Sequence, residues 1–96
     1  MKDFFVYILK CNDGSFYIGH TDDIDERISK HKNGFYEGYT KTRLPVEVVF
    51  TQQFATRDEA FNAERQIKGW SRAKKKAFIS NDWNGLKNLS KRKKKQ

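Results

Sequence analysis

The residues that could carry chemistry in this 96-residue chain are two tyrosines, an arginine, a histidine and a glutamate. An arginine can neutralise an anionic group, and a tyrosine or a histidine can accept, donate or orient a proton. Each also has a structural explanation when it is taken singly: packing for the tyrosines and ion pairing for the charged residues. The five residues are Tyr7, Tyr17, Arg27, His31 and Glu64. No single one identifies an enzyme, so the elements that position them matter.

Tyr7 and Tyr17 belong to two short runs of aromatic and β-branched residues on either side of a Cys-Asn-Asp-Gly segment. This pattern predicts a β-hairpin. A two-residue loop would place Tyr7 opposite His20, with Tyr17 on the other face. A three-residue loop would place Tyr7 opposite Gly19 instead. Only the second register puts both tyrosines on one face of the sheet.

A helix is expected to follow the hairpin. The segment Thr-Asp-Asp at positions 21–23 offers N-terminal caps, acidic residues crowd the first turn, and Asn-Gly at positions 33–34 ends the helix. Arg27 and His31 lie one helical turn apart. His31 falls within the apolar stripe of the helix, and Arg27 lies at the border of that stripe. Both side chains can therefore face the sheet.

The remaining segments predict a loop, a strand and two helices. Residues 35–44 show neither the helical nor the strand periodicity of apolar residues and are expected to form a long exposed loop. A strand over residues 45–54 would place Val46, Val48 and Phe50 on one face by alternation.

The two later helices carry clear start signals. The capping box Thr-Arg-Asp-Glu at positions 56–59 opens a helix that runs through residues 67–69. Glu64 falls near the core side of this helix, where a carboxylate needs a partner. Ser71 can cap a third helix through Ile79, with Ala73 among its inward residues.

Composition and charge restrict the class of protein. Twenty Lys plus Arg against twelve Asp plus Glu give a formal net charge of +8, which favours a polyanionic partner. Six of these charges lie in residues 87–96, so we expect one domain over residues 1–86 and a disordered basic tail. The sequence has no run of 18 apolar residues, no signal-peptide pattern and a single cysteine. We therefore expect a cytoplasmic protein without a membrane span, disulfide or zinc site.

The order and spacing of these residues resemble the GIY-YIG nuclease family over residues 4–79. The resemblance rests on Val-Tyr-Ile at 6–8, Tyr-Ile-Gly at 17–19, the Arg27-x-x-x-His31 helix and Glu64. Within the family the chain is similar to the short stand-alone bacterial proteins of the YhbQ-like group. The shared features are the Phe-Val-Tyr-Ile-Leu-Lys-Cys opening, the Tyr-Thr pair at 39–40 and the Ala-Glu-x-x-Ile-Lys segment at 63–68.

The resemblance implies a fold of the α/β (α+β) class, with a small three-stranded antiparallel sheet flanked by about three helices. It also implies one phosphodiesterase site on a face of the sheet. By this likeness Tyr7 and Tyr17 would be the paired tyrosines of the site. A phenol with an ordinary pKa of about 10 is a weak base at neutral pH. Tyr7 would therefore either act as the general base, with its phenolate favoured by the cation, Arg27 or His31, or orient the attacking water, and Tyr17 would have a supporting, orienting role. Arg27 would contact the phosphate, and His31 would lie near the reacting tyrosine. Glu64 would be the sole protein ligand of a single Mg²⁺ or Mn²⁺ ion, a plausible weak site because Mg²⁺ completes its shell with water and phosphate oxygens.

Two departures from the family pattern favour weak activity. His20 stands where repair-incision members carry a lysine, so a proton shuttle is kept but a permanent positive charge is lost. Lysines at 74–76 stand where many nucleases carry an asparagine near the site.

We therefore expect a metal-dependent endonuclease that hydrolyses DNA phosphodiester bonds, structure-directed or of low specificity, in bacterial DNA repair or recombination. Its partner would be nucleic acid, DNA rather than RNA, and the chain would be a monomer aided by a targeting protein. The residues expected to contact nucleic acid are His20, Lys41, Arg43, Lys74 and Lys75.

Two other functions are compatible with the sequence. A catalytically inactive nucleic-acid-binding module would keep the basic surface, show salt-sensitive binding and have Glu64 engaged by a lysine or arginine. A protein-interaction adaptor would instead use the aromatic loop at 35–39 to dock a partner.

Overall fold

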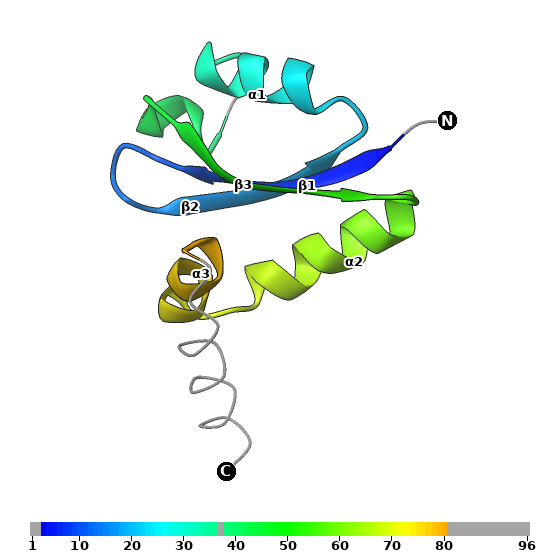
Figure 1. Cartoon of the computed structure of the whole chain (residues 1–96). Helices are drawn as coiled ribbons and strands as arrows, with labels where there is room; N and C mark the ends of the chain where they lie inside the picture. Colours follow the sequence, from blue (N-terminus) through cyan, green and yellow to red (C-terminus); the bar gives the residue numbers. More distant parts are fainter. Residues whose placement is uncertain (1–2, 37, 81–96) are drawn as a thin grey trace.

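The computed structural model describes residues 3–36 and 38–80, whose elements form a three-stranded sheet between two helical layers (Figure 1). In chain order the elements are β1 (Phe4–Lys10), β2 (Phe16–Thr21), α1 (Ile24–Lys32), the 3-10 helix η1 (Lys41–Arg43), β3 (Glu47–Phe54), α2 (Arg57–Lys68) and α3 (Arg72–Ile79). The strand order is β2-β1-β3, and both pairings are antiparallel. Helix α1 covers one face of the sheet, and α2 and α3 cover the other (Figure 1). The expected fold class is confirmed.

Two expectations from the sequence, the basic tail and the lack of a membrane span, involve residues outside the described ranges. The basic tail at 87–96 lies outside the described residues. Within the described ranges, no helix is long and apolar enough to cross a membrane.

The β1–β2 hairpin adopts the register with the three-residue loop. Cys11 and Ser15 close the loop through a backbone hydrogen bond of 2.8 Å, and Gly14 has a φ of 82°. That left-handed conformation suits a residue without a Cβ. Tyr7 consequently pairs with Gly19 and Leu9 with Tyr17, so both tyrosines lie on the α1 face.

Gly19 makes room for the ring of Tyr7. A Cβ built on Gly19 would lie 2.6 Å from Cζ of Tyr7, far inside van der Waals contact. Tyr7 is 0% exposed, so its ring has no free space into which it could retreat. The glycine is therefore required by close packing across the hairpin.

The sheet separates two hydrophobic cores. Between the sheet and helices α2 and α3 lies a core whose buried members are Val6, Ile8, Ile18, Ala60 and Ile67. On the α1 face lies a second core whose buried members are Tyr7, Leu9, Cys11 and Val46. Alternation along β1 and β2 assigns successive side chains to opposite cores. The tyrosine face is thus built into a packed core.

The β3 strand does not keep the simple alternation that its sequence suggests. Ile8 pairs with Phe50 but Leu9 pairs with Val48, so the register shifts by one residue. Such a bulge turns the side chains beyond it to the other face. Val48 packs in the Tyr7 core and Phe50 in the α2 core. The prediction that Val46, Val48 and Phe50 share one face was therefore wrong.

The helix starts follow their capping residues. The side chain of Asp23 accepts a hydrogen bond from the backbone N–H of Glu26 at the start of α1. The capping box at the start of α2 is formed, and Ser71 caps α3. Ala73, expected to point inward, is exposed, because the buried side of α3 runs through Ala77 instead.

We predict that Gly19→Ala lowers the free energy of unfolding by about 1–3 kcal/mol, because the added methyl overpacks the Tyr7 ring. Urea denaturation would measure the loss. Gly69→Ala is the matched control: its Cβ would have its nearest contact at 3.5 Å, and its φ of −80° suits alanine. Equal stability losses in the two variants would contradict the close-packing explanation.

Candidate active site

The hydroxyl of Tyr7 shares a buried hydrogen bond with His31. Its oxygen lies 3.0 Å from Nε2 of His31, and Nδ1 of the same ring lies 2.9 Å from Oγ1 of Thr40. All three residues are at most 2% exposed. Strand β1, helix α1 and the loop before η1 each supply one of these three residues. The contacts join a phenol, an imidazole and an alcohol in one chain of polar groups.

Burial changes the proton chemistry of this pair. Burial and the nearby Tyr17 raise the pKa of Tyr7 far above its usual range, and the hydrogen bond and charge of Arg27 offset only part of that rise. Burial, aided by the positive charge of Arg27, lowers the pKa of His31. Near neutral pH the pair is therefore a neutral phenol and a neutral imidazole.

Other aromatic rings pack around the Tyr7–His31 pair. The ring centroids of Tyr17 and Tyr36 lie 5.1 Å and 4.6 Å from that of His31. Tyr17 also contacts Tyr39 with a centroid separation of 6.1 Å. Tyr17 and Tyr36 are half-buried, whereas Tyr7 is inaccessible to solvent. Water can reach the Tyr7 hydroxyl only if a neighbouring side chain moves.

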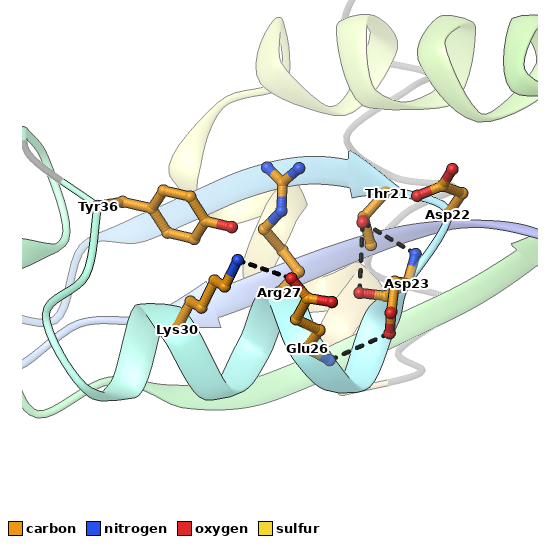
Figure 2. A pocket seen from close by; sticks show the side chains of 7 residues that line it. All are labelled: Thr21, Asp22, Asp23, Glu26, Arg27, Lys30 and Tyr36. Atoms are coloured by element: carbon orange, nitrogen blue, oxygen red, sulfur yellow. Dashed lines mark hydrogen bonds and ion pairs between the residues drawn. The ribbon is translucent and has the colours of Figure 1, made fainter.

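Arg27 projects from α1 into a polar pocket of about 320 Å³. Figure 2 shows its guanidinium standing between the ring of Tyr36 and the side chains of Thr21 and Asp22. Cζ of Arg27 lies 5.1 Å from the centroid of the Tyr36 ring, within the range of a cation–π contact. The pocket has room for a phosphate group beside this guanidinium, and its lining also carries Lys30 and the carboxylates of Asp22, Asp23 and Glu26.

Glu64 lies in a separate, largely buried setting on α2. Nδ1–H of His20 donates to its Oε1 at 2.6 Å, and Nζ of Lys68 lies 3.0 Å from its Oε2. Burial acts to raise the pKa of Glu64, but the hydrogen bonds from His20 and Lys68 and their charges outweigh it and lower the pKa. The carboxylate is therefore ionised near neutral pH, with both oxygens engaged.

The donor set around Glu64 suits a weakly held cation. Among the described residues no group of three or more His, Cys, Asp or Glu side chains could hold a metal ion. Mg²⁺ often takes one or two carboxylates and fills its remaining positions with water and phosphate oxygens. The Lys68 side chain is 54% exposed, so it can swing into solvent and release Oε2. Glu64 then fits a divalent cation that arrives with a phosphate group.

The structure brings four of the five sequence-predicted catalytic residues to one face of the sheet. Tyr7, Tyr17, Arg27 and His31 lie on the α1 side. Glu64 belongs to α2 and meets His20, whose neighbour Ile18 packs in the opposite core. The two groups lie on either side of β2, which is an edge strand.

An ion pair connects the two helical layers at the end of β2. Nη2 of Arg57, in the first turn of α2, lies 3.6 Å from Oδ2 of Asp22, which lines the Arg27 pocket. A ligand at this end of β2 can therefore meet groups from both layers.

The residues expected to contact nucleic acid have varied surroundings. Arg43 donates to Asp13 Oδ2 and to the Tyr39 carbonyl, each at 3.0 Å. Lys74 lies 4.7 Å from the centroid of the Trp70 ring, and Lys75 is half-buried. The structure thus gives Arg43 a role in anchoring its loop. Lys41 is exposed but also has a partner, and His20 is bonded to Glu64 as described above.

Three residues that shape the site were not singled out as site residues from the sequence. Thr40 bonds His31, Tyr36 packs on His31 and Arg27, and Lys68 contacts Glu64. The i, i+4 spacing does predict the Lys68 contact. No sequence spacing signals that a loop threonine meets a histidine nine positions before it.

Comparison with known proteins identifies the family. The model of the GIY-YIG catalytic domain matches residues 3–77, and the chain belongs to the GIY-YIG family. A UPF0213 protein of Staphylococcus saprophyticus is 48% identical over 80 residues, covering 83% of this chain and 98% of that protein. One of Streptococcus pneumoniae is 42% identical over 76 residues, covering 79% and 77%. The relatives are thus short bacterial proteins.

Two solution NMR structures share the fold. That of a UPF0213 protein from Bacillus halodurans has 44% identity and a TM-score of 0.55, covering 81% of this chain and 83% of that one. That of a protein from E. faecalis has 35% identity and a TM-score of 0.58, covering 84% and 86%. The names of these relatives state no activity, so the function of this chain has to be argued from its site.

We predict that Lys68→Met raises the pKa of Glu64, because burial, which raises this pKa, is then opposed by His20 without the help of Lys68. A ¹³C NMR titration of the glutamate carboxyls would measure the change. The folded-state pKa of Glu64 is lowered, so its contribution to stability is present above the unfolded-state pKa and is lost as the pH falls through the folded-state value. The stability deficit of Lys68→Met should accordingly shrink in acid.

Lys32→Met is the control for this titration, since Lys32 is exposed at the end of α1, in the other helical layer. It removes the same charge without touching Glu64. An unchanged Glu64 pKa in Lys68→Met would contradict the assigned ion pair.

Proposed function

We propose that the chain is a metal-dependent endonuclease that hydrolyses DNA phosphodiester bonds. Membership of the GIY-YIG family supports a nuclease, and one observation of the site supports catalysis: the Tyr7 hydroxyl is bonded to His31 beside Arg27. A phenol held against an imidazole can pass on a proton, and a guanidinium can stabilise the charge on a phosphate.

Tyr7 and His31 together accept the proton of the attacking water through two linked proton transfers. The raised pKa of Tyr7 means that its phenolate does not form first. The attacking water gives a proton to the Tyr7 oxygen while the phenolic proton passes to Nε2 of His31. The water becomes the hydroxide that forms a bond to phosphorus, the P–O bond to the leaving oxygen breaks, and that oxygen takes a proton from solvent water. Tyr7 stays neutral, and His31 becomes an imidazolium. Each proton is accounted for without an exposed base.

Arg27 couples phosphate binding to the opening of this pair. Its guanidinium stacks on Tyr36, whose ring also packs on His31. A phosphate in the pocket forms charge-assisted hydrogen bonds to Arg27, which are stronger than the cation–π contact that they replace. Tyr36 belongs to a loop, so its side chain can leave and admit water to Tyr7. Tyr17, half-buried beside His31, orients that water.

Glu64 completes the site from the other side of β2. Its Oε2, once released by Lys68, would hold a divalent cation together with water and phosphate oxygens. When bound, such a cation neutralises charge on the phosphate and the leaving oxygen. In this proposal the scissile phosphate lies across the end of β2, between Arg27 and Glu64.

A second function is favoured by one specific observation. A catalytically inactive nucleic-acid-binding module predicts that Glu64 is engaged by a lysine or an arginine, and Lys68 lies 3.0 Å from its Oε2. Full burial of Tyr7 agrees with the same reading. This module would bind nucleic acid in a salt-dependent manner without cutting it.

Cleavage of supercoiled plasmid and branched DNA oligonucleotides in Mg²⁺, then in Mn²⁺, separates the two functions. We predict nicking by the wild-type chain, abolished by EDTA and reduced about 100-fold or more in Tyr7→Phe and in Glu64→Gln. Circular dichroism of each variant checks its folding, because Tyr7→Phe leaves Nε2 of His31 without its hydrogen-bond partner.

Gln66→Ala is the matched control, since Gln66 is exposed on α2 two residues from Glu64. It should cut like the wild type. Salt-dependent binding with no cleavage by the folded wild type in either metal would favour the binding module. Cleavage that survives both active-site substitutions would mean that the proposed residues are wrong. A DNA repair or recombination role, DNA preference over RNA, monomeric state and cytoplasmic location stay predictions.

A further inference from the structure

Thr40 occupies an unusual position for a hydroxyl residue that precedes a helical turn. It is the N-cap of η1, yet its side chain makes no capping hydrogen bond. Its Oγ1 instead lies 2.9 Å from Nδ1 of His31, and the residue is 2% exposed. A threonine at an N-cap ordinarily satisfies the free N–H groups of its own helix. Here the hydroxyl is committed to the imidazole.

The position of Thr40 is held by contacts of Arg43 to the hairpin. Arg43 donates through Nε to Asp13, and its carbonyl accepts from the backbone N–H of Asn12 at 2.9 Å. Its own backbone N–H donates to the Thr40 carbonyl at 3.0 Å. These bonds tie η1 to the β1–β2 loop, so Oγ1 of Thr40 is presented to His31 by a fixed backbone.

The protons on the ring can be assigned by comparing the two hydroxyl groups that contact it. A neutral imidazole has one N–H donor and one bare nitrogen that accepts. A proton on Nε2 would leave the phenolic hydrogen of Tyr7 without the ring as its acceptor, whereas a proton on Nδ1 would do the same to the hydroxyl hydrogen of Thr40. Arg27, the other polar group that bonds Tyr7, has only N–H donors. The phenol is also a stronger donor than the threonine alcohol, so Nε2 accepts from Tyr7.

We infer that Thr40 is a positioning residue that accepts the Nδ1–H of His31 and so keeps Nε2 free to take the proton of Tyr7. The contact selects one of the two neutral tautomers and also orients the ring. When His31 receives the Tyr7 proton, the same hydroxyl stabilises the imidazolium at Nδ1. The role of this contact in catalysis rests on the proposed function, whereas the assignment of the His31 tautomer does not depend on it.

Nitrogen-15 NMR of the histidine rings tests the assignment without any cleavage assay. The chain has two histidines, and the signals that remain in His20→Gln identify His31. In the wild type above pH 7 we expect Nδ1 of His31 to be protonated and Nε2 to be bare. Thr40→Val, which keeps the shape but removes the hydroxyl, should shift the ring toward a mixture of tautomers. Thr40→Ser should restore the wild-type signals.

The outcomes separate this inference from the proposed nuclease. A wild-type His31 protonated at Nε2, or Thr40→Val with unchanged ring signals, overturns the role of Thr40. If Thr40→Val does not fold, the wild-type spectrum and that of Thr40→Ser still decide the tautomer. Cleavage in parallel should fall about tenfold or more in Thr40→Val and recover in Thr40→Ser. An inactive wild type with the expected tautomer would refute the nuclease and leave the positioning role intact.

Discussion

The close approach of the Tyr7 ring to Gly19 is the constraint on which the site depends. Because Gly19 has no Cβ, the ring of Tyr7 on the central strand can pack closely against the edge strand and be fully buried. That burial keeps the phenol un-ionised and brings its hydroxyl to His31. In the same register, which the three-residue loop sets, Tyr17 shares this face of the sheet. A side chain opposite Tyr7 would disturb the register, the core and the polar chain together.

In the proposed nuclease, the edge position of β2 is what lets groups from both helical layers reach one phosphate. Arg27 approaches this strand from the α1 side, and Glu64 approaches from the α2 side. Interior strands would keep such groups apart, whereas the end of an edge strand is accessible from both layers. The ion pair between Asp22 and Arg57 indicates how near the layers come there. Charge pairing at Glu64 and cation–π stacking at Arg27 give both groups partners within the protein.

Local signals predicted most of the fold, because hairpin loops, capping boxes and helical periodicity depend on residues close together in sequence. Alternation in β3 failed because the bulge depends on packing against two different cores, which the strand's own residues do not encode. The site divides in the same way. The Glu64–Lys68 contact follows from helical spacing, but the Thr40–His31 bond and the burial of Tyr7 arise from tertiary packing. The sequence suggested which residues form the site, and the structure adds that Tyr7 is screened from water.

The pH dependence of the cleavage rate at saturating Mg²⁺ tests the central claim most directly, namely that Tyr7 passes its proton to His31. The pKa of His31 is lowered below its ordinary value of about 6.5, so the accepting imidazole is neutral throughout the alkaline range. The account predicts a single-turnover rate that is level from about pH 7 to 9 and falls only in acid, below the ordinary histidine pKa, as His31 becomes protonated. A rate that climbs about tenfold per pH unit from 7 to 9 would contradict it, because Tyr7 would then have to ionise before the reaction.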